Sequence, residues 1–350
     1  MKAARWYAAK DIRVEETEIP SPKKNQVKIE VKFTGICGSD LHEYLHGPLS
    51  ISMDKPFPLT GHNGITTLGH EFSGVVAEIG EGVKNINIGD RVVIEPMYRN
   101  PDSPYLLTGK YNLSEPSGFI GFNSNGGFAK YTIAEDYMVH KIPDSMTFEE
   151  GAVVEPAAVA VQAVHQSELK IGQSCVIFGA GPIGLLTVLA AIAAGASKII
   201  VVDVAEKRLE KAKEIGANHV INGKSENIPQ QIQELTNGGA DISFDAAGVQ
   251  ASFNNAVASV KKGGTIVLIA IYGRDITHNA SAIVIKEITL KGTIAYRNIF
   301  PKVISLIDSG IMPVNKLITS KIKLDNIVSE GFEALISSPK EVKIIVDVNQ

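Results

Sequence analysis

The chain has 350 residues, a net charge of −4 and dispersed lysines and arginines, which argues against a nucleic-acid-binding protein. This length can bury a sizeable core and predicts two domains. The longest apolar run, residues 180–196, is shorter than a membrane span and is better explained as a buried helix, so we expect no membrane partner. The chain lacks an early apolar signal core, and Cys37 and Cys175 lie far apart. Both features are compatible with a reducing cytoplasm and argue against a disulfide framework.

The first third of the sequence is typical of short β-strands joined by loops. Val27-Lys-Ile-Glu-Val-Lys-Phe33 alternates apolar and polar residues with a period of two. Residues 35–42 break this pattern with polar, chemically capable side chains. Residues 46–67 are loop-like, and residues 97–127, rich in Pro, Gly and Ser, form a predicted long loop. Together the short strands and glycine turns predict an irregular β-barrel with that loop packed on it.

The pattern changes at Phe148, where residues 148–167 are predicted to form a helix. Thr147 and Glu150 have the spacing of a capping box at its start. From there strands alternate with helices, which predicts an α/β fold, a doubly wound parallel sheet with helices on both faces. The expected strands are 174–178, 198–202, 241–245 and 264–269, and the expected helices are 182–194, 205–215, 251–260 and 299–309. A last strand, residues 343–348, is expected to return to the first domain.

The glycine-rich stretch Gly179-Ala-Gly-Pro-Ile-Gly184 joins a predicted strand to a predicted helix. Such a loop leaves backbone N–H groups free at a helix N-terminus, where they can bind a pyrophosphate. Asp203 ends the next strand, where its carboxylate would accept hydrogen bonds from an adenosine ribose and disfavour a 2′-phosphate. Lys207 and Arg208 would soften that preference. The sequence predicts NAD as coenzyme, bound by Gly179, Gly181, Pro182, Ile183, Gly184, Asp203 and Arg208.

Three segments carry candidate metal ligands, namely Cys37, the pair His70–Glu71, and Glu155. Glu155 lies in an apolar run, where a carboxylate is costly to bury unless it is paired or binds a cation. A thiolate, an imidazole and a carboxylate form a mixed set that suits Zn²⁺, and three protein ligands leave one position open for catalysis. Zn²⁺ there would acidify a bound alcohol and prepare it to give a hydride to NAD⁺. Glu71 is either an alternative ligand or a neighbour of the ligands.

The residues that follow Cys37 are candidates for proton transfer. Ser39 could take the hydroxyl proton of the alcohol, and the more exposed His42 could release that proton near neutral pH. Asp40 could orient a histidine ligand. The alternative for Ser39 and His42 is that both are ordinary loop residues.

Five motifs resemble the zinc-dependent medium-chain alcohol dehydrogenase family, and the resemblance covers essentially the whole chain: Gly35-Ile-Cys-Gly-Ser-Asp-Leu-His42, Gly69-His-Glu71, Gly89-Asp-Arg-Val92, Val154-Glu-Pro156 and Gly179-Ala-Gly-Pro-Ile-Gly184. The resemblance implies a GroES-like catalytic domain of residues 1–150, completed by 293–350, and a Rossmann domain of residues 151–292. It implies zinc ligation by Cys37, His70 and Glu155 with Glu71 nearby, and NAD as coenzyme.

Within this family, residues 37–48 and 294–301 resemble the (R,R)-2,3-butanediol dehydrogenase branch. The implied substrate is a small vicinal diol or hydroxy-ketone, with acetoin and 2,3-butanediol as the main pair and diacetyl as a further carbonyl. Glu43, Tyr44 and Tyr296 are candidate pocket residues. The alternatives are a sorbitol or other polyol dehydrogenase, an L-threonine 3-dehydrogenase, and a non-catalytic NAD-binding structural protein.

The sequence departs from many relatives in the loop after Val93. Those relatives carry four cysteines there that bind a structural zinc, whereas this chain has Asn100, Ser103, Leu106 and Ser114. We therefore expect one catalytic zinc and no structural zinc. The loop must instead be held by packing, for which Tyr105, Leu106, Leu107 and Tyr111 are the candidates. This loop contributes to subunit contacts in the family, and a homo-oligomer, dimer or tetramer, is expected.

Overall fold

The computed structural model describes residues Met1 to Asn349, and these form two compact units. Unit 1 contains residues Met1–Glu155, Phe300–Asp308 and the chain from Ile318 onward. Unit 2 contains Pro156–Ile299 and Ser309–Leu317. Within the described residues, no helix combines the length and the apolar character that a bilayer span requires.

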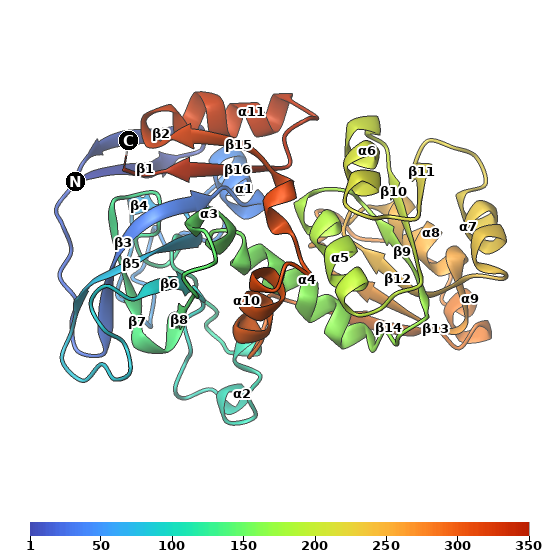
Figure 1. The fold of residues 1–350 in the computed structure, drawn as a ribbon, viewed down its shortest axis with the longest axis horizontal. Coiled ribbons are helices and arrows are strands. Elements are labelled where there is room, and N and C mark those ends of the chain that lie inside the picture. The colour runs from blue at the N-terminus through green and yellow to red at the C-terminus, as the bar shows by residue number, and fades with distance from the viewer. Residues whose placement is uncertain (350) are drawn as a thin grey trace. The chain divides into compact units, whose positions relative to one another are not determined.

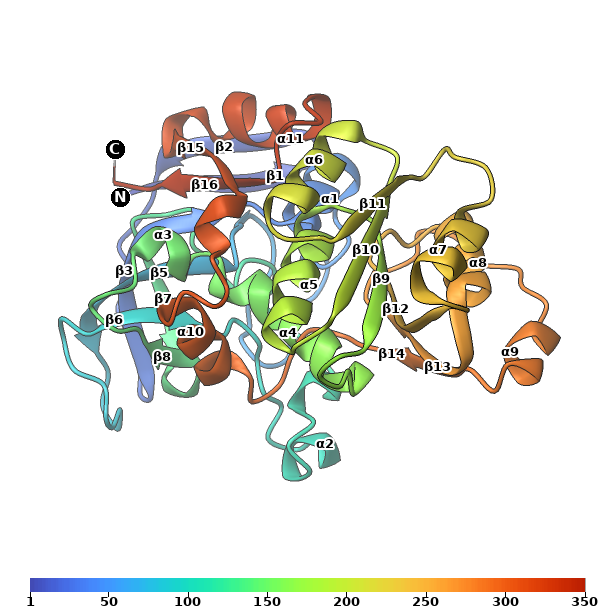
Figure 2. The same cartoon turned by 45° about the vertical axis from the view of Figure 1, so that its right-hand side comes forward.

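Unit 1 is built on two sheets (Figure 1). The larger has the order β15-β16-β3-β5-β6-β8, with β7 also paired to β3, and the smaller has the order β2-β1-β4. Figure 2 shows β15 and β16 as neighbouring arrows, although they lie more than 300 positions after the first strand of this unit. The strands are β1 (Lys2–Ala8), β2 (Asp11–Glu16), β3 (Gln26–Gly35), β4 (Thr66–Thr67), β5 (Glu71–Ile79), β6 (Arg91–Ile94), β7 (Tyr131–Glu135), β8 (Val139–Lys141), β15 (Ile318–Lys323) and β16 (Lys343–Asp347).

The alternating residues of β3 explain how this barrel-like unit is held together. Val27, Ile29 and Val31 point into a common core, whereas the residues between them are partly exposed. Trp6 and Phe72 enter the same core from neighbouring strands. Burial of such side chains stabilises each by about 1.5–3 kcal/mol. The helices of this unit are α1 (Gly38–His46), α2 (Pro104–Leu107), α3 (Phe148–Gly151), α10 (Phe300–Asp308) and α11 (Glu333–Ser337).

The structure differs from the expectation at two places in this part of the chain. Residues 38–46 form helix α1, which was not predicted, because Asp40 accepts the amide of Cys37 at the helix start while Leu41, Tyr44 and Leu45 pack on the core. The predicted helix 148–167 is interrupted: α3 ends at Gly151 and α4 (Val154–Ser167) begins three residues later. Gly151 packs so closely on Ser73 that a Cβ would lie 2.7 Å from that side chain. The predicted capping box of Thr147 and Glu150 is confirmed.

Unit 2 contains one parallel sheet of order β11-β10-β9-β12-β13-β14. The chain moves outward in one direction from β9 and then returns to start the other half at β12, so the carboxyl ends of β9 and β12 form the switch point of the sheet. The strands are β9 (Ser174–Phe178), β10 (Lys198–Asp203), β11 (His219–Asn222), β12 (Ala240–Asp245), β13 (Val260–Leu268) and β14 (Thr289–Gly292).

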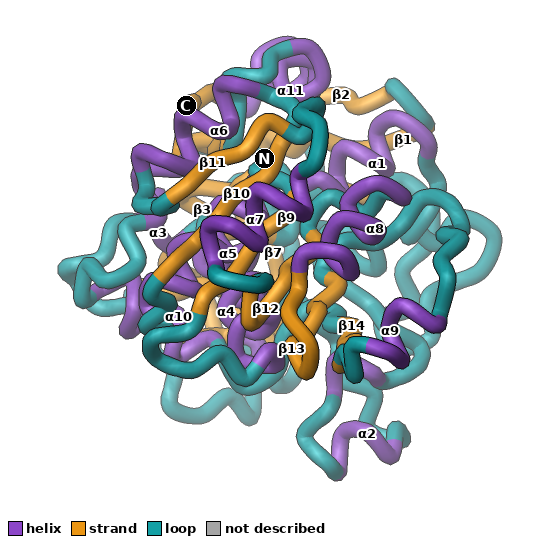
Figure 3. Tube along the Cα trace, turned by 90° about the vertical axis from the view of Figure 1, so that its right-hand side faces the viewer, coloured by secondary structure: helices purple, strands orange, loops and turns teal. Residues whose placement is uncertain are grey.

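Helices cover both faces of this parallel sheet. Figure 1 shows α5 and α6 on one side and α7 and α8 on the other, and Figure 3 shows the strands between them in orange. Because both faces are covered, the strands are nearly continuous apolar runs, as in Ile199–Val202. The helices are α5 (Pro182–Ala193), α6 (Glu206–Glu214), α7 (Ile228–Thr236), α8 (Gln250–Ser259) and α9 (Ser281–Ile285). The predicted doubly wound α/β fold is confirmed.

Candidate active site

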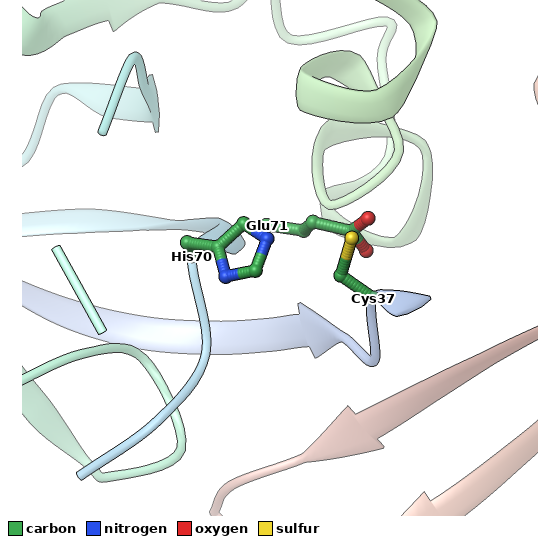
Figure 4. A group of neighbouring side chains, drawn as sticks. All are labelled: Cys37, His70 and Glu71. Atoms are coloured by element: carbon green, nitrogen blue, oxygen red, sulfur yellow. The ribbon is translucent and has the colours of Figure 1, made fainter. Parts of the chain in front are cut away.

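A compact group of Cys37, His70 and Glu71 lies in unit 1 (Figure 4). One ligand atom from each residue lies within 4.8 Å of the others. The two segments meet because β3 pairs with β5, which places Gly35 opposite Glu71 at the end of the ladder. Cys37 then caps helix α1, and His70 immediately precedes β5. The sheet pairing therefore assembles a thiol, an imidazole and a carboxylate, a donor set that fits Zn²⁺.

Asp40 connects the two segments that carry these ligands. Its side chain is fully buried, accepts the amides of Cys37 at 3.0 Å and Gly69 at 3.3 Å, and lies 3.4 Å from Nδ1 of His70. Burial lowers the pKa of His70, but the charges of Asp40 and Cys37 outweigh that effect and hold the pKa well above its usual value. The predicted orienting contact between Asp40 and the histidine is therefore present as a close approach.

The predicted proton-relay residues both lie on helix α1. The hydroxyl oxygen of Ser39 is 3.2 Å from Nε2 of His70, and Ser39 is exposed. His42 is exposed one turn further along the same helix. Residues three positions apart share a helix face, so Ser39 and His42 can form two successive steps of a proton path from the candidate metal group to solvent.

The structure adds one residue to the group that the sequence reasoning missed. Nζ of Lys343, on β16, donates to Oε1 of Glu71 at 2.9 Å and to Oε2 at 2.7 Å. Burial lowers the pKa of Lys343, but the charge of Glu71 and then that of Cys37 raise it above its usual value. The signal in the sequence was a lysine that opens the otherwise apolar run Ile344-Ile-Val346. Lysine is almost never fully buried unless it is paired.

Glu155 lies in the first turn of α4 with 6% of its surface exposed. Its charge also raises the pKa of Lys343, which places it in the electrostatic surroundings of the group. Among the described residues, the compact set of possible ligands contains Glu71 and does not contain Glu155. Its role as a ligand stays a prediction.

A pocket of about 350 Å³ in unit 2 lies at the switch point of the parallel sheet. Gly179 has a φ of +96° and packs against Ala246 and Ala247, where a Cβ would be only 3.0 Å from a backbone nitrogen. Gly184 packs directly on the carbonyl of Gly179, whereas a Cβ at Gly181 would meet open space. Gly179 and Gly184 thus allow a tight turn, and Gly181 leaves space for a pyrophosphate to approach the backbone.

The predicted coenzyme residues occupy the wall of this pocket and the helix behind it. Gly179, Gly181, Asp203 and Arg208 line the pocket. Pro182 begins α5, followed by Ile183. The carboxylate of Asp203 accepts the amides of Ala180 at 2.6 Å and Ala205 at 2.8 Å. Asp203 therefore also anchors the glycine loop, a role that the sequence reasoning did not foresee.

The three candidate substrate-pocket residues are all buried. The Glu43 carboxylate accepts the amides of Leu49 and Ser50, and the Tyr44 hydroxyl donates to Glu333 at 2.6 Å. Tyr296 has 1% of its surface exposed. Contacts inside unit 1 thus account for Glu43 and Tyr44 as residues that fix a loop and a helix, and a substrate contact of the three residues stays a prediction.

The loop after β6 is held by polar groups and cation–π contacts. Arg99 lies over the rings of Tyr111 at 4.2 Å and Tyr137 at 4.7 Å. The buried Glu95 accepts a hydrogen bond from Tyr111 at 2.5 Å and pairs with His140 at 2.9 Å. The predicted packing of this loop is confirmed for Tyr111. It was wrong for Tyr105 and Leu107, which are 45% and 88% exposed because helix α2 buries none of its residues.

Comparisons with known proteins agree with this architecture. Residues 23–144 match the alcohol dehydrogenase GroES-like domain, and residues 182–309 match the zinc-binding dehydrogenase family. The chain is 46% identical to (R,R)-butanediol dehydrogenase of Bacillus subtilis, with 100% of both chains covered. It is 34% identical to sorbitol dehydrogenase of the same organism, with 100% of this chain and 98% of the relative covered.

A solved structure extends the likeness from sequence to fold. The crystal structure of 2R,3R-butanediol dehydrogenase from Bacillus subtilis matches this chain with a TM-score of 0.95 and 46% identity, over 99% of each chain. These matches confirm the resemblance and the combination of a GroES-like domain with a dinucleotide-binding domain. The chain therefore belongs to the zinc-dependent medium-chain alcohol dehydrogenase family.

Proposed function

We propose that the protein is an NAD-dependent dehydrogenase that interconverts (R,R)-2,3-butanediol and acetoin, with acetoin and diacetyl as a further pair. The observation that carries this proposal is the 46% identity, over the full length of both chains, to a relative named (R,R)-butanediol dehydrogenase. The group of Cys37, His70 and Glu71 supports it, because a metal held there could activate a small alcohol.

The proposed chemistry assigns a role to each residue of the site. Cys37 and His70 hold the metal together with a carboxylate, Glu71 or Glu155. When bound, zinc polarises the substrate hydroxyl and lowers its pKa. Ser39 accepts the hydroxyl proton, and His42 passes that proton to solvent. Asp40 keeps the His70 ring in place through its approach to Nδ1. With NAD⁺ bound, the carbon that bears this hydroxyl would give its hydride to the nicotinamide.

The pocket in unit 2 and the contacts of the loop after β6 support our proposals for the coenzyme and the metal content. Residues 151–292 form the proposed coenzyme domain, with the pyrophosphate over Gly181 and the adenosine ribose near Asp203. A 2′-phosphate would meet the Asp203 charge, which favours NAD. We propose one catalytic zinc and no structural zinc, because Glu95, Arg99 and Tyr111 already hold the loop concerned. A homo-oligomer and a cytoplasmic location also remain predictions.

The closest alternative keeps the chemistry and changes the substrate to sorbitol or another polyol. The 34% identity to a sorbitol dehydrogenase over nearly the whole of both chains favours it over an L-threonine 3-dehydrogenase. The deciding experiment compares NADH oxidation with acetoin and with fructose on zinc-loaded protein. We expect much faster turnover of acetoin, and a preference for fructose would refute the butanediol assignment.

A matched variant separates an enzyme from a non-catalytic NAD-binding protein. Cys37→Ser should lose zinc and turnover but still bind NADH, because the coenzyme pocket is formed by unit 2 alone. Cys175→Ser, at a buried thiol of β9, is the control and should keep zinc. Unchanged turnover in Cys37→Ser would refute the zinc mechanism.

A further inference from the structure

Two buried carboxylates flank the strand that leads into the glycine loop of unit 2. Phe178, the last residue of β9, pairs with Val202 of β10 on one side and with Asp245 of β12 on the other. Asp203 follows Val202 and holds the glycine loop through the amide of Ala180. Asp245 has no exposed surface. A buried carboxylate is costly unless it is hydrogen-bonded, so the contacts of Asp245 define its role.

Uncharged donors satisfy the carboxylate of Asp245. Its Oδ1 accepts the amides of Ala247 at 2.9 Å and Gly248 at 3.1 Å. Its Oδ2 accepts the hydroxyls of Ser252 at 2.8 Å and Tyr272 at 2.6 Å. Burial, and then the bond to Asp245, raise the pKa of Tyr272, so the phenol stays protonated and donates at neutral pH. The carboxylate thus joins the turn after β12 to helix α8 and to the chain after β13.

The turn that Asp245 holds is part of the wall of the coenzyme pocket. Ala246 and Ala247 line that pocket, and Gly179 of the glycine loop packs against both of them. A Cβ at Gly179 would lie 3.0 Å from the nitrogen of Ala247, the same nitrogen that donates to Asp245. The contact is this close because Gly179 has no side chain. A displacement of the turn would therefore change the shape of the pocket beside the glycine loop.

The chain after β13 is fastened to the same turn. The carbonyl oxygen of Asp245 accepts the amides of Ile269 at 2.9 Å and Ala270 at 3.1 Å. Further along, the hydroxyl of Tyr272 binds the carboxylate of Asp245. A Cβ at Gly248 would lie 2.9 Å from Ala270, so the turn and this chain also pack together. Asp245 therefore ties the chain after β13 to the pocket wall through both its backbone and its side chain.

We propose that Asp245 is a positioning residue for the coenzyme and that Tyr272 fixes the Asp245 side chain in its working position. The carboxylate holds the turn of residues 246–248 in the shape that receives the dinucleotide. The phenol fixes Oδ2, the oxygen that the turn does not use. This inference rests on the coenzyme site of the proposed function. It does not depend on the metal or on which alcohol is the substrate.

Fluorescence titration with NADH, in the absence of substrate, tests the proposal. Tyr272→Phe should weaken NADH binding about fivefold, because a hydrogen bond to a carboxylate contributes about tenfold or more to an equilibrium and part of it acts on the pocket. Asp245→Ala should weaken binding by at least about tenfold, because the amides of the turn lose their acceptor. Asp245→Asn should stay within about twofold of the native protein, since its oxygen still accepts both amides and the two hydroxyls can accept from its NH₂ group.

Matched substitutions elsewhere in the chain serve as controls. Tyr98→Phe removes a buried hydroxyl that binds Ser124 in unit 1. Asp241→Ala removes a carboxylate that accepts the amide and the hydroxyl of Ser174 at the other end of β12. Both control variants should keep the native dissociation constant for NADH. Urea unfolding is measured in parallel, because a variant that only loses stability keeps the native dissociation constant while it is folded.

Native NADH affinity in folded Tyr272→Phe would overturn the proposal. An Asp245→Asn protein that binds NADH as weakly as Asp245→Ala would also overturn it, because charge and not position would then be the cause. If Asp245→Ala does not fold, Tyr272→Phe decides the question. Failure of the native protein to bind NADH would instead refute the proposed coenzyme, and inactivity toward acetoin would refute only the proposed substrate.

Discussion

The hydroxyl of Tyr111 donates a hydrogen bond of 2.5 Å to Oε1 of Glu95, at the start of the loop after β6. His140 occupies the other oxygen of the same carboxylate, and Arg99 covers the Tyr111 ring. Tyr111 and Glu95 are 3% and 2% exposed. A buried network of side chains thus anchors the loop after β6.

Removing the Tyr111 hydroxyl should destabilise the protein without changing its metal content. In Tyr111→Phe the buried Glu95 loses one donor, at an expected cost of about 1–3 kcal/mol in the free energy of unfolding. Urea unfolding measures this cost, and metal analysis measures the zinc. Tyr105→Phe is the matched control, because Tyr105 is 45% exposed, and should be neutral. A second zinc per chain would contradict the proposed anchoring.

Asp40→Asn should weaken metal binding while leaving the fold intact. The Asp40 carboxylate holds the amides on both sides of the site and approaches Nδ1 of His70. Partners of this kind typically contribute about 10–100-fold in metal affinity. Competition with a chromophoric chelator measures the change. Asp54→Asn, at an exposed loop position, is the control, and equal zinc affinity in both variants would remove Asp40 from the site.

Ser39→Ala should slow turnover and leave zinc bound. The Ser39 hydroxyl is the proposed acceptor of the substrate proton, and positioned proton transfer contributes about 10²–10⁴-fold to rate. We expect kcat to fall at least about tenfold, and Ser39→Thr to recover part of it because a hydroxyl is retained. Steady-state rates with acetoin and zinc analysis test both variants. Native kcat in Ser39→Ala would exclude a relay through this residue.

The local patterns in the sequence predicted most of the fold. The alternation in residues 27–33 and the glycine stretch 179–184 are patterns formed by residues close together in the sequence. Strand β3 and helix α5 formed there as expected. Helix α1 was missed because its sequence, Gly-Ser-Asp-Leu-His-Glu-Tyr-Leu-His, is short and mostly polar, although Leu41, Tyr44 and Leu45 have the spacing of one helix face. It forms because Asp40 caps it and the barrel core receives Tyr44. The contact of Tyr44 with the core is tertiary and leaves no local signal, whereas the bond from the Cys37 amide to Asp40 is local.

The site shows the same division between local motifs and long-range contacts. Cys37 and His70 stand in compact motifs, so the sequence could propose them together. The partner of Glu71 could not be found in that way, because Lys343 is 272 residues distant and meets it only through the pairing of β16 with β3. Asp203 was assigned to the ribose alone, since its bonds to Ala180 and Ala205 depend on the folded glycine loop.

Asp203→Ser should reduce the preference for NADH over NADPH. The substitution removes the charge that opposes a 2′-phosphate and retains Arg208, which lines the same pocket. It also weakens the bond to the Ala180 amide, so NADH binding should weaken by about tenfold, or about 1.4 kcal/mol. Fluorescence titration with both coenzymes measures the two dissociation constants. Asp241→Ser, at the opposite end of the sheet, is the control. An unchanged ratio of the two constants would contradict the specificity role of Asp203.

Glu135→Gln should stabilise the protein at neutral pH and have little effect in acid. Burial raises the pKa of Glu135 above its usual value of 4.5, opposed by the hydrogen bond from Gln26 and aided by the charge of Asp136. The folded chain therefore binds this proton more tightly than the unfolded chain. Its contribution to stability is fully present below pH 4.5 and is lost as the pH rises through the folded pKa. A glutamine cannot ionise and can still accept the Gln26 amide, so the free energy of unfolding should rise at pH 7 and stay nearly unchanged at pH 4. Unfolding by urea at pH 4 and pH 7 measures the difference, and an equal effect of the substitution at both values would show that ionisation of Glu135 is not its cause.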